Sequence, residues 1–224
     1  MKLTWYGHAT FYIKAEDGTT IFTDPHNPAT SGYAPYDKPA DIVVMSSSTD
    51  DFHNNESLIP GEHIVVNALE LAQSGRSRTK KGIAFEAVEA LENTAHRGGH
   101  PDQNGMYRFE IDGVTVGHMG DMGNALSAPQ LEFFRGVDVL LALAGGYPVI
   151  GLDSLKKMID EVKPKLVVPM HFQTLRLKTN DALWLGDFLS RFDKGDIDFA
   201  CDDTVTLTKT DLPEETRVLV LDHV

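Results

Sequence analysis

The stretch that decides the fold is residues 40–55, ADIVVMSSSTDDFHNN, in which an apolar run ends in a polar loop. Residues 42–45 are apolar at four successive positions, which is typical of a buried strand. The loop that follows contains carboxylates and one imidazole, His53, and these groups bind zinc-like metals, whereas hydroxyls and the phenyl ring of Phe52 do not bind them usefully. The side chains of this loop therefore decide whether it can hold a metal ion.

The composition is that of a globular domain with an acidic surface. The chain has 224 residues, 42% of them hydrophobic, so we expect a single domain spanning residues 1–224. The 20 Lys and Arg against 33 Asp and Glu give a net charge of −13, which repels phosphate backbones and anionic membranes. The basic run at residues 76–81 is short and is typical of a solvated loop. We therefore expect neither nucleic acid nor a membrane as a partner.

Cysteine use and the N-terminus indicate the compartment. The single cysteine, Cys201, excludes an intramolecular disulfide framework and a multi-cysteine metal site. The first residues lack the apolar stretch of a signal peptide, and no run approaches the roughly 18 apolar residues of a membrane span. We expect a soluble, cytoplasmic protein.

Short strands dominate the first half of the chain, and helices alternate with strands in the second half. Asp-Gly pairs at residues 16–19 and 111–114 lie between apolar runs and predict two hairpins. Apolar residues at helical spacing predict a helix over residues 152–162 and a second one over 185–192 that begins near a cap at 179–181. The alternation favours a layered α/β sandwich over a purely parallel sheet. Strands are expected at residues 3–6, 11–14, 20–23, 42–45, 64–66, 83–88, 166–169, 197–200, 205–208 and 218–221.

Further segments, in order along the chain, carry a resemblance to a known family. These are WYGHATF at residues 5–11 with FTDP at 22–25, GVTVGHMGD at 113–121, VDVLLALAGG at 137–146 and KPKLVVPMHF at 163–172. Together with residues 40–55 they resemble the metallo-β-lactamase superfamily, and the opening resembles its ascorbate-6-phosphate-lactonase-like branch. The resemblance covers about residues 1–175 and implies a four-layer αββα sandwich with mixed sheets, an α/β fold.

The ligand loop of that superfamily reads His-x-His-x-Asp-His directly after a strand. In this chain Ser47, Thr49 and Phe52 stand at the positions of the three motif histidines, and only Asp51 matches. The resemblance therefore implies a degenerate ligand motif.

Four residues of this chain match ligand positions of the family. The resemblance implies that Asp51, His96, Asp121 and His171 are metal ligands and that Asp51 or Asp121 holds or deprotonates the attacking water. His53 and His100 could compensate for missing ligands, because His53 follows Phe52 and His100 shares a glycine-rich loop with His96.

Metal binding should be weaker than in a complete site. Loss of even one residue that supports a ligand typically costs roughly 10 to 100-fold in metal affinity, so three lost ligands cost about 10³ to 10⁶-fold. We expect one ion rather than two, zinc or another divalent metal such as Mn or Fe, or no metal if catalysis has been lost.

Each of these side chains also has a structural interpretation without metal. Histidines in a glycine-rich loop are often solvated, a histidine after a strand can cap the strand end, and aspartates form turns and helix caps. His8 lies either near the mouth of the site or packed at a strand end, and both interpretations stay open. His118 either points away from the site or supports Asp121.

Two functions follow from these observations. The first is a hydrolase with a reduced metal site that cleaves an ester, a lactone or a phosphorylated small molecule. The second is a non-catalytic relative that binds a small molecule or acts in assembly through the former cleft, because Phe52 fills space and excludes water from a metal. The partner is a small molecule in both cases, and a homo-oligomer is also expected.

Overall fold

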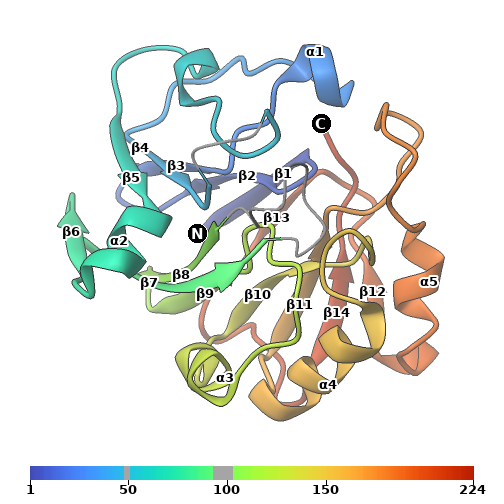
Figure 1. Cartoon of the computed structure of the whole chain (residues 1–224). Helices are drawn as coiled ribbons and strands as arrows, with labels where there is room; N and C mark the ends of the chain where they lie inside the picture. The colour runs from blue at the N-terminus through green and yellow to red at the C-terminus, as the bar shows by residue number, and fades with distance from the viewer. Residues whose placement is uncertain (48–50, 93–102) are drawn as a thin grey trace.

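In the computed structural model, described for residues 1–47, 51–92 and 103–224, two β-sheets face each other (Figure 1). One sheet has the strand order β13-β1-β2-β3-β4-β5 and the other β12-β14-β11-β10-β9-β8-β7-β6. The strands are β1 Lys2–Gly7, β2 Thr10–Lys14, β3 Thr20–Thr23, β4 Ile42–Met45, β5 Ile64–Asn67, β6 Arg78–Lys80, β7 Ile83–Leu91, β8 Gln103–Ile111, β9 Val114–His118, β10 Val139–Leu143, β11 Leu166–Met170, β12 Ile197–Phe199, β13 Thr204–Thr206 and β14 Arg217–Val220.

Helices α3 and α4 lie on the outer face of the sheet that contains β10, and α1 lies on the far side of the other sheet (Figure 1). Helix α2 contacts β7 and β8 and also reaches β4 and β5. The helices are α1 Pro28–Ser31, α2 Ala68–Ser74, α3 Ala128–Phe134, α4 Leu152–Val162 and α5 Leu185–Leu189, with short 3₁₀ turns at Glu56–Leu58 and Lys194–Asp196. The expected mixed-sheet αββα sandwich is confirmed. Among the described residues, no helix is both long and apolar enough to span a bilayer.

The core lies between the sheets, where the inward faces of both supply buried apolar side chains. A second, smaller cluster forms around Tyr6, Phe22 and Val43, whose side chains pack against Tyr36 and Ile59. Strands β4 and β10 are buried at every position, so both of their faces are covered. This explains why both strands are apolar throughout.

The predicted elements were mostly confirmed. Both hairpins form, since β2 pairs antiparallel with β3 and β8 with β9. In the second hairpin Asp112 and Gly113 both have positive φ, 52° and 74°, as a tight turn of this type requires. The helix at 152–162 is α4, and its five apolar residues at helical spacing are all buried.

The second predicted helix begins at the expected residue, but it is shorter than the sequence indicates and its cap is a different residue. α5 begins at Leu185, with Trp184 rather than residues 179–181 as its N-cap. The reason is a competing set of backbone hydrogen bonds: Leu183 N–H donates to Gly145 O at 2.7 Å, and Gln173 N–H donates to Leu183 O at 2.8 Å. These bonds hold the chain extended before the helix. α2 and α3 were not predicted.

The carboxyl ends of parallel strands define one edge of the molecule. β3, β4 and β5 run parallel in one sheet, and β9, β10 and β11 run parallel in the other. The two edges meet, because Gly105 N–H donates to Ser46 O at 2.7 Å, directly after β4. Residues that follow these strands are therefore gathered at a common edge, the usual place for a site in α/β sheets.

Candidate metal centre

Three buried histidines from distant parts of the chain converge at this edge. One ring nitrogen each of His8, His53 and His171 lies within 4.8 Å of the other two. The ring centroid of His8 is 3.9 Å from that of His171 and 5.1 Å from that of His53. Three imidazoles at such spacing can bind one zinc-like ion and leave a position open for water or substrate.

His8 reaches the cluster because β1 ends in a tight turn before β2. Gly7 and His8 both have positive φ, 97° and 49°. At Gly7 a Cβ atom would lie 2.3 Å from the Tyr33 ring, so only glycine fits there. A histidine in the left-handed region costs of order 1–3 kcal/mol, and such strain is concentrated at functional sites.

His171 follows β11 directly and is held in the same way. Its φ is 56°, and its backbone N–H donates to His8 O at 3.0 Å. The indole Nε1–H of Trp5 donates to the same carbonyl, also at 3.0 Å. The backbones of the two histidines are thus joined directly, which fixes the spacing of their rings.

His53 is positioned by the loop after β4, and its side chain is buried. The carbonyl of Asp51 accepts hydrogen bonds from Asn27 N–H and from Asn55 Nδ2, each at 2.8 Å. Asn55 N–H and Nδ2 also donate to Pro25 O, at 3.0 and 3.1 Å. The loop is therefore tied to the segment after β3 on both sides of His53.

Two of the three imidazoles carry a buried ring nitrogen that has no hydrogen-bond partner among the described residues, namely Nδ1 of His8 and Nδ1 of His171. An unsatisfied buried polar atom is costly, so it calls for an explanation such as a ligand or an ion. Burial and then the neighbouring His171 and His53 hold the pKa of His8 well below its usual range, so its imidazole is neutral at pH 7. A neutral imidazole is the form that binds metal.

Asp121 lies next to His171, with its Oδ1 2.9 Å from His171 Nε2. The contact lacks the geometry of a hydrogen bond, since Asp121 Oδ1 has no hydrogen-bond partner among the described residues. The nearby negative charge nevertheless favours a proton on Nε2, which leaves the lone pair on Nδ1. Metal-binding histidines usually contact a carboxylate or carbonyl through their second nitrogen in this way. The pair therefore presents Nδ1 of His171 as a ligand.

The turn that carries Asp121 is fixed by two buried polar side chains. Asn104 Oδ1 accepts from Asp121 N–H at 3.0 Å, and its Nδ2 donates to Met119 O at 3.0 Å. His118 Nδ1 accepts from Gly120 N–H, and its Nε2 lies 2.9 Å from Ala9 O. Of the two interpretations of His118, support of the Asp121 turn is the one the structure shows.

Only some of the site residues predicted from the sequence lie together in the structure. His171 and Asp121 are in contact, and His53 is in the cluster with His171. Asp51 is exposed and is not in the cluster that the described residues form, although its carbonyl holds the His53 loop. His96 and His100 lie outside the described residues, so their roles stay predictions.

His8 is the member of the cluster that sequence reasoning did not place among the ligands. The signal that could have found it is the Gly7-His8 pair directly after a strand, since a strand end can bring a side chain to the sheet edge.

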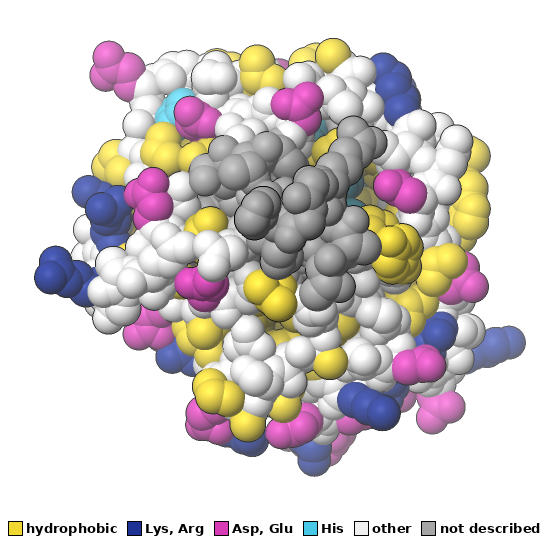
Figure 2. Space-filling view, viewed as in Figure 1, with side chains coloured by type: hydrophobic (Ala, Val, Ile, Leu, Met, Phe, Trp, Pro, Cys, Tyr) yellow, Lys and Arg dark blue, Asp and Glu magenta, His cyan; other side chains and the backbone are white. Residues whose placement is uncertain are grey.

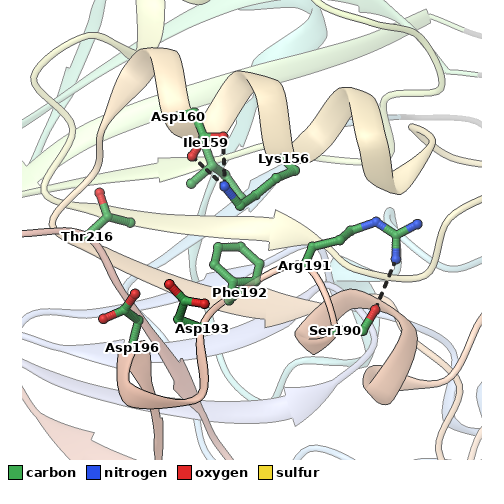
Figure 3. Close-up of a pocket in the computed structure, with 9 residues that line it drawn as sticks. All are labelled: Lys156, Ile159, Asp160, Ser190, Arg191, Phe192, Asp193, Asp196 and Thr216. Atoms are coloured by element: carbon green, nitrogen blue, oxygen red, sulfur yellow. Dashed lines mark hydrogen bonds and ion pairs between the residues drawn. The ribbon is translucent and has the colours of Figure 1, made fainter.

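A cavity of about 280 Å³ lies elsewhere, between α4 and residues 190–196 (Figure 3). Its charged side chains are largely paired: Lys156 Nζ donates to both carboxylate oxygens of Asp160, and Arg191 donates to Asp153. No histidine or cysteine is among its lining residues, so this cavity offers no such ligand to a metal.

Comparison with known proteins agrees with this geometry. Residues 2–171 match the family model described as "Beta-lactamase superfamily domain". A UPF0173 metal-dependent hydrolase of Pelotomaculum thermopropionicum is 29% identical, covering 81% of this chain and 88% of that protein. One from Anaeromyxobacter dehalogenans is 28% identical, covering 77% and 75%.

A solved structure from Thermotoga maritima, described as a Zn-dependent hydrolase of the metallo-β-lactamase superfamily, superposes with a TM-score of 0.77. It is 32% identical and covers 100% of this chain and 99% of that one. The family match spans most of the chain and includes His8, His53, Asp121 and His171. The chain therefore belongs to the β-lactamase superfamily domain family.

Proposed function

We propose that this protein is a metal-dependent hydrolase whose metal is held by His8, His53 and His171. The observation that carries the proposal is the convergence of the three buried imidazoles, with the unpartnered Nδ1 atoms of His8 and His171. The names of its relatives, which describe metal-dependent and Zn-dependent hydrolases, support the same reaction class.

The protein's own residues would bind the metal ion and orient its ligands. The three imidazoles hold the ion, and Asp121 holds the His171 ring with Nδ1 available. A bound divalent ion would supply Lewis acidity and lower the pKa of a bound water. Asp121, with Asp51 as the second candidate, is the carboxylate we assign to hold or deprotonate the attacking water.

We infer one ion rather than two. Ser47 and Phe52 stand at former histidine positions, and the Phe52 ring packs 4.9 Å from the His8 ring, where it occupies space next to the cluster. An all-imidazole set suits zinc best among the metals considered, with iron or manganese as the alternatives. Within the superfamily, we place the chain near the ascorbate-6-phosphate-lactonase-like branch, with a degenerate ligand loop.

The substrate is proposed to be an ester, a lactone or a phosphorylated small molecule. The non-catalytic alternative has less support, because a chain that had only kept its fold would not need strained backbone at both His8 and His171.

Metal analysis of the purified protein tests the proposal, together with hydrolysis of an ester and phosphoester panel. We expect about one equivalent of metal and metal-dependent turnover, both lost in His171→Ala. His63→Ala is the matched control, since His63 precedes β5 at the opposite end of the parallel strands. Absence of both bound metal and metal-dependent turnover in the wild type would reject the proposal.

A further inference from the structure

The middle strand of three is followed by an exposed tyrosine at the sheet edge that carries the candidate metal centre. β10 lies between β9 and β11 and runs parallel to both. The segment after β9 carries Asp121, and the segment after β11 begins with His171. Because carboxyl ends of parallel strands share one edge, the Gly145-Gly146-Tyr147 segment after β10 emerges between these two site residues.

Backbone contacts tie this segment to His171. A Cβ atom at Gly145 would lie 2.0 Å from His171 O, so the two backbones are in direct contact. Leu183 N–H donates to Gly145 O at 2.7 Å, and Gln173 N–H donates to Leu183 O at 2.8 Å. Residues 172–184 therefore fold back beside the same edge.

These two segments present large apolar side chains to solvent. Tyr147 is 69% exposed, Leu183 43%, Trp184 53% and Leu175 94%. We call these four side chains the apolar rim. They are four of the nine large hydrophobic side chains that are exposed in the described part of the chain. Figure 2 shows a group of hydrophobic side chains right of the centre of the viewed face, close to a small area of histidine.

Leu183 packs beside the segment that carries Tyr147. At Gly146 a Cβ atom would lie 2.7 Å from Leu183 Cδ1, so the Leu183 side chain lies directly on the backbone that precedes Tyr147. A concentration of exposed apolar groups at a site edge marks a binding surface rather than ordinary surface composition.

Charges near the rim are few. Residues 145–150 contain no Lys, Arg, His, Asp or Glu, and Lys178 Nζ donates to Ala29 O. Within residues 172–184 a phosphate dianion would meet two cationic side chains, Arg176 and Lys178, and the carboxylate of Asp181, whereas phosphate sites normally offer several charge-assisted donors.

We propose that the apolar rim binds the acyl or aryl group of the substrate and that the substrates are uncharged esters or lactones. This inference rests on the proposed function. In the reaction, water adds to the carbonyl carbon, the bond from that carbon to the ester oxygen breaks, and the leaving oxygen takes a proton. The products are a carboxylic acid and an alcohol, or a hydroxy acid from a lactone, with no change in oxidation state.

A binding experiment tests the rim without turnover. Of the two tryptophans, Trp5 is 2% exposed and Trp184 is 53% exposed. The fluorescence of Trp184 should therefore change when a ligand covers its side chain. We expect octanoate to shift the tryptophan fluorescence emission to the blue and acetate to leave this emission unchanged. Trp184→Phe should abolish the shift, and Tyr147→Ser should weaken octanoate binding at least fivefold.

Three outcomes would overturn the rim as an acyl site. They are equal responses to octanoate and acetate, a shift that survives in Trp184→Phe, or a blue shift that grows with protein concentration in the absence of octanoate. The last would mean that a second copy of the chain covers Trp184.

Kinetics on the metal-loaded protein give the second test. Along p-nitrophenyl acetate, butyrate and octanoate, kcat/KM should rise about two- to fourfold per methylene, the range for partial to full burial. Tyr147→Ser should reduce the rise of kcat/KM with acyl chain length. The control Phe199→Ser, on exposed β12, should leave this rise unchanged.

The two proposals fail in different ways. A flat series, or faster cleavage of bis(p-nitrophenyl) phosphate than of any ester, would overturn the rim while leaving the metal hydrolase intact. A wild-type protein that binds no metal and hydrolyses no substrate even after metal is added would overturn the proposed function.

Discussion

At the scale of single residues, the candidate centre depends on two histidines held in an unfavourable backbone conformation. His8 and His171 have φ of 49° and 56°, and the N–H of one donates to the carbonyl of the other. Sequence analysis could place His171 because the segment KPKLVVPMHF resembles the closing segment of the family, which ends in a histidine ligand. It left His8 open, because a positive φ at a non-glycine residue has no clear signature in sequence.

Asp121→Asn tests the orientation of His171. The amide keeps the size of the side chain but removes the negative charge beside Nε2, so the preference for a lone pair on Nδ1 weakens. We expect metal affinity to fall roughly 10 to 100-fold, as for other residues that support a ligand. Competition with a chelator of known affinity measures this. Unchanged affinity would show that the contact does not orient His171.

At the scale of elements, the site is assembled by strand ends. The strands were largely predictable, because apolar runs bounded by Gly, Pro, Asn and Asp mark them, and Asp112-Gly113 marks a hairpin. α3 was missed although Ser127 and Gln130 form a capping box at its start. The cap of α5 was placed too early, because long-range hydrogen bonds at Leu183 overrode the local cap signal at residues 179–181.

Gly145→Ala tests the contact between the segment after β10 and the end of β11. The new Cβ would lie 2.0 Å from His171 O and must push the two backbones apart. We expect a loss of about 1–3 kcal/mol in the free energy of unfolding, together with weaker metal binding. Chemical denaturation and chelator competition measure the two effects.

Gly186→Ala is the matched control, because a Cβ there meets nothing within 4 Å and the residue lies in α5. It should be neutral or stabilising by up to about 1 kcal/mol. Equal effects of the two substitutions would contradict the close contact at Gly145.

At the scale of the whole molecule, the two sheets meet over a core that includes buried polar groups. His118 is fully buried, and burial lowers its pKa to about 3. Its two ring nitrogens contact Gly120 N–H and Ala9 O, so the neutral ring joins the β9 end to the turn before β2. Sequence could predict the two layers, but it could not predict which polar side chains connect them.

Stability should therefore fall as the pH is lowered. The unfolded chain protonates His118 below about pH 6.5, whereas the folded protein does so only near pH 3. Its contribution is fully present above pH 6.5 and is lost as the pH falls toward 3. At about 1.4 kcal/mol per pKa unit, His118 alone accounts for about 2–3 kcal/mol between pH 7.5 and 4.5.

Urea unfolding at both pH values, on the wild type and on His118→Gln, measures this contribution. The difference in free energy of unfolding between the two pH values should shrink by about that amount in the variant. If the difference is the same in both proteins, His118 is not the group responsible.

The most direct test of the account is the metal content and affinity of His8→Ala compared with the wild type and with His63→Ala. His8 belongs to the three-histidine cluster but is not among the residues that match ligand positions of the resembling family. If the three imidazoles hold the ion, His8→Ala should lose at least a hundredfold in affinity while His63→Ala keeps wild-type binding. Wild-type affinity in folded His8→Ala would contradict the account.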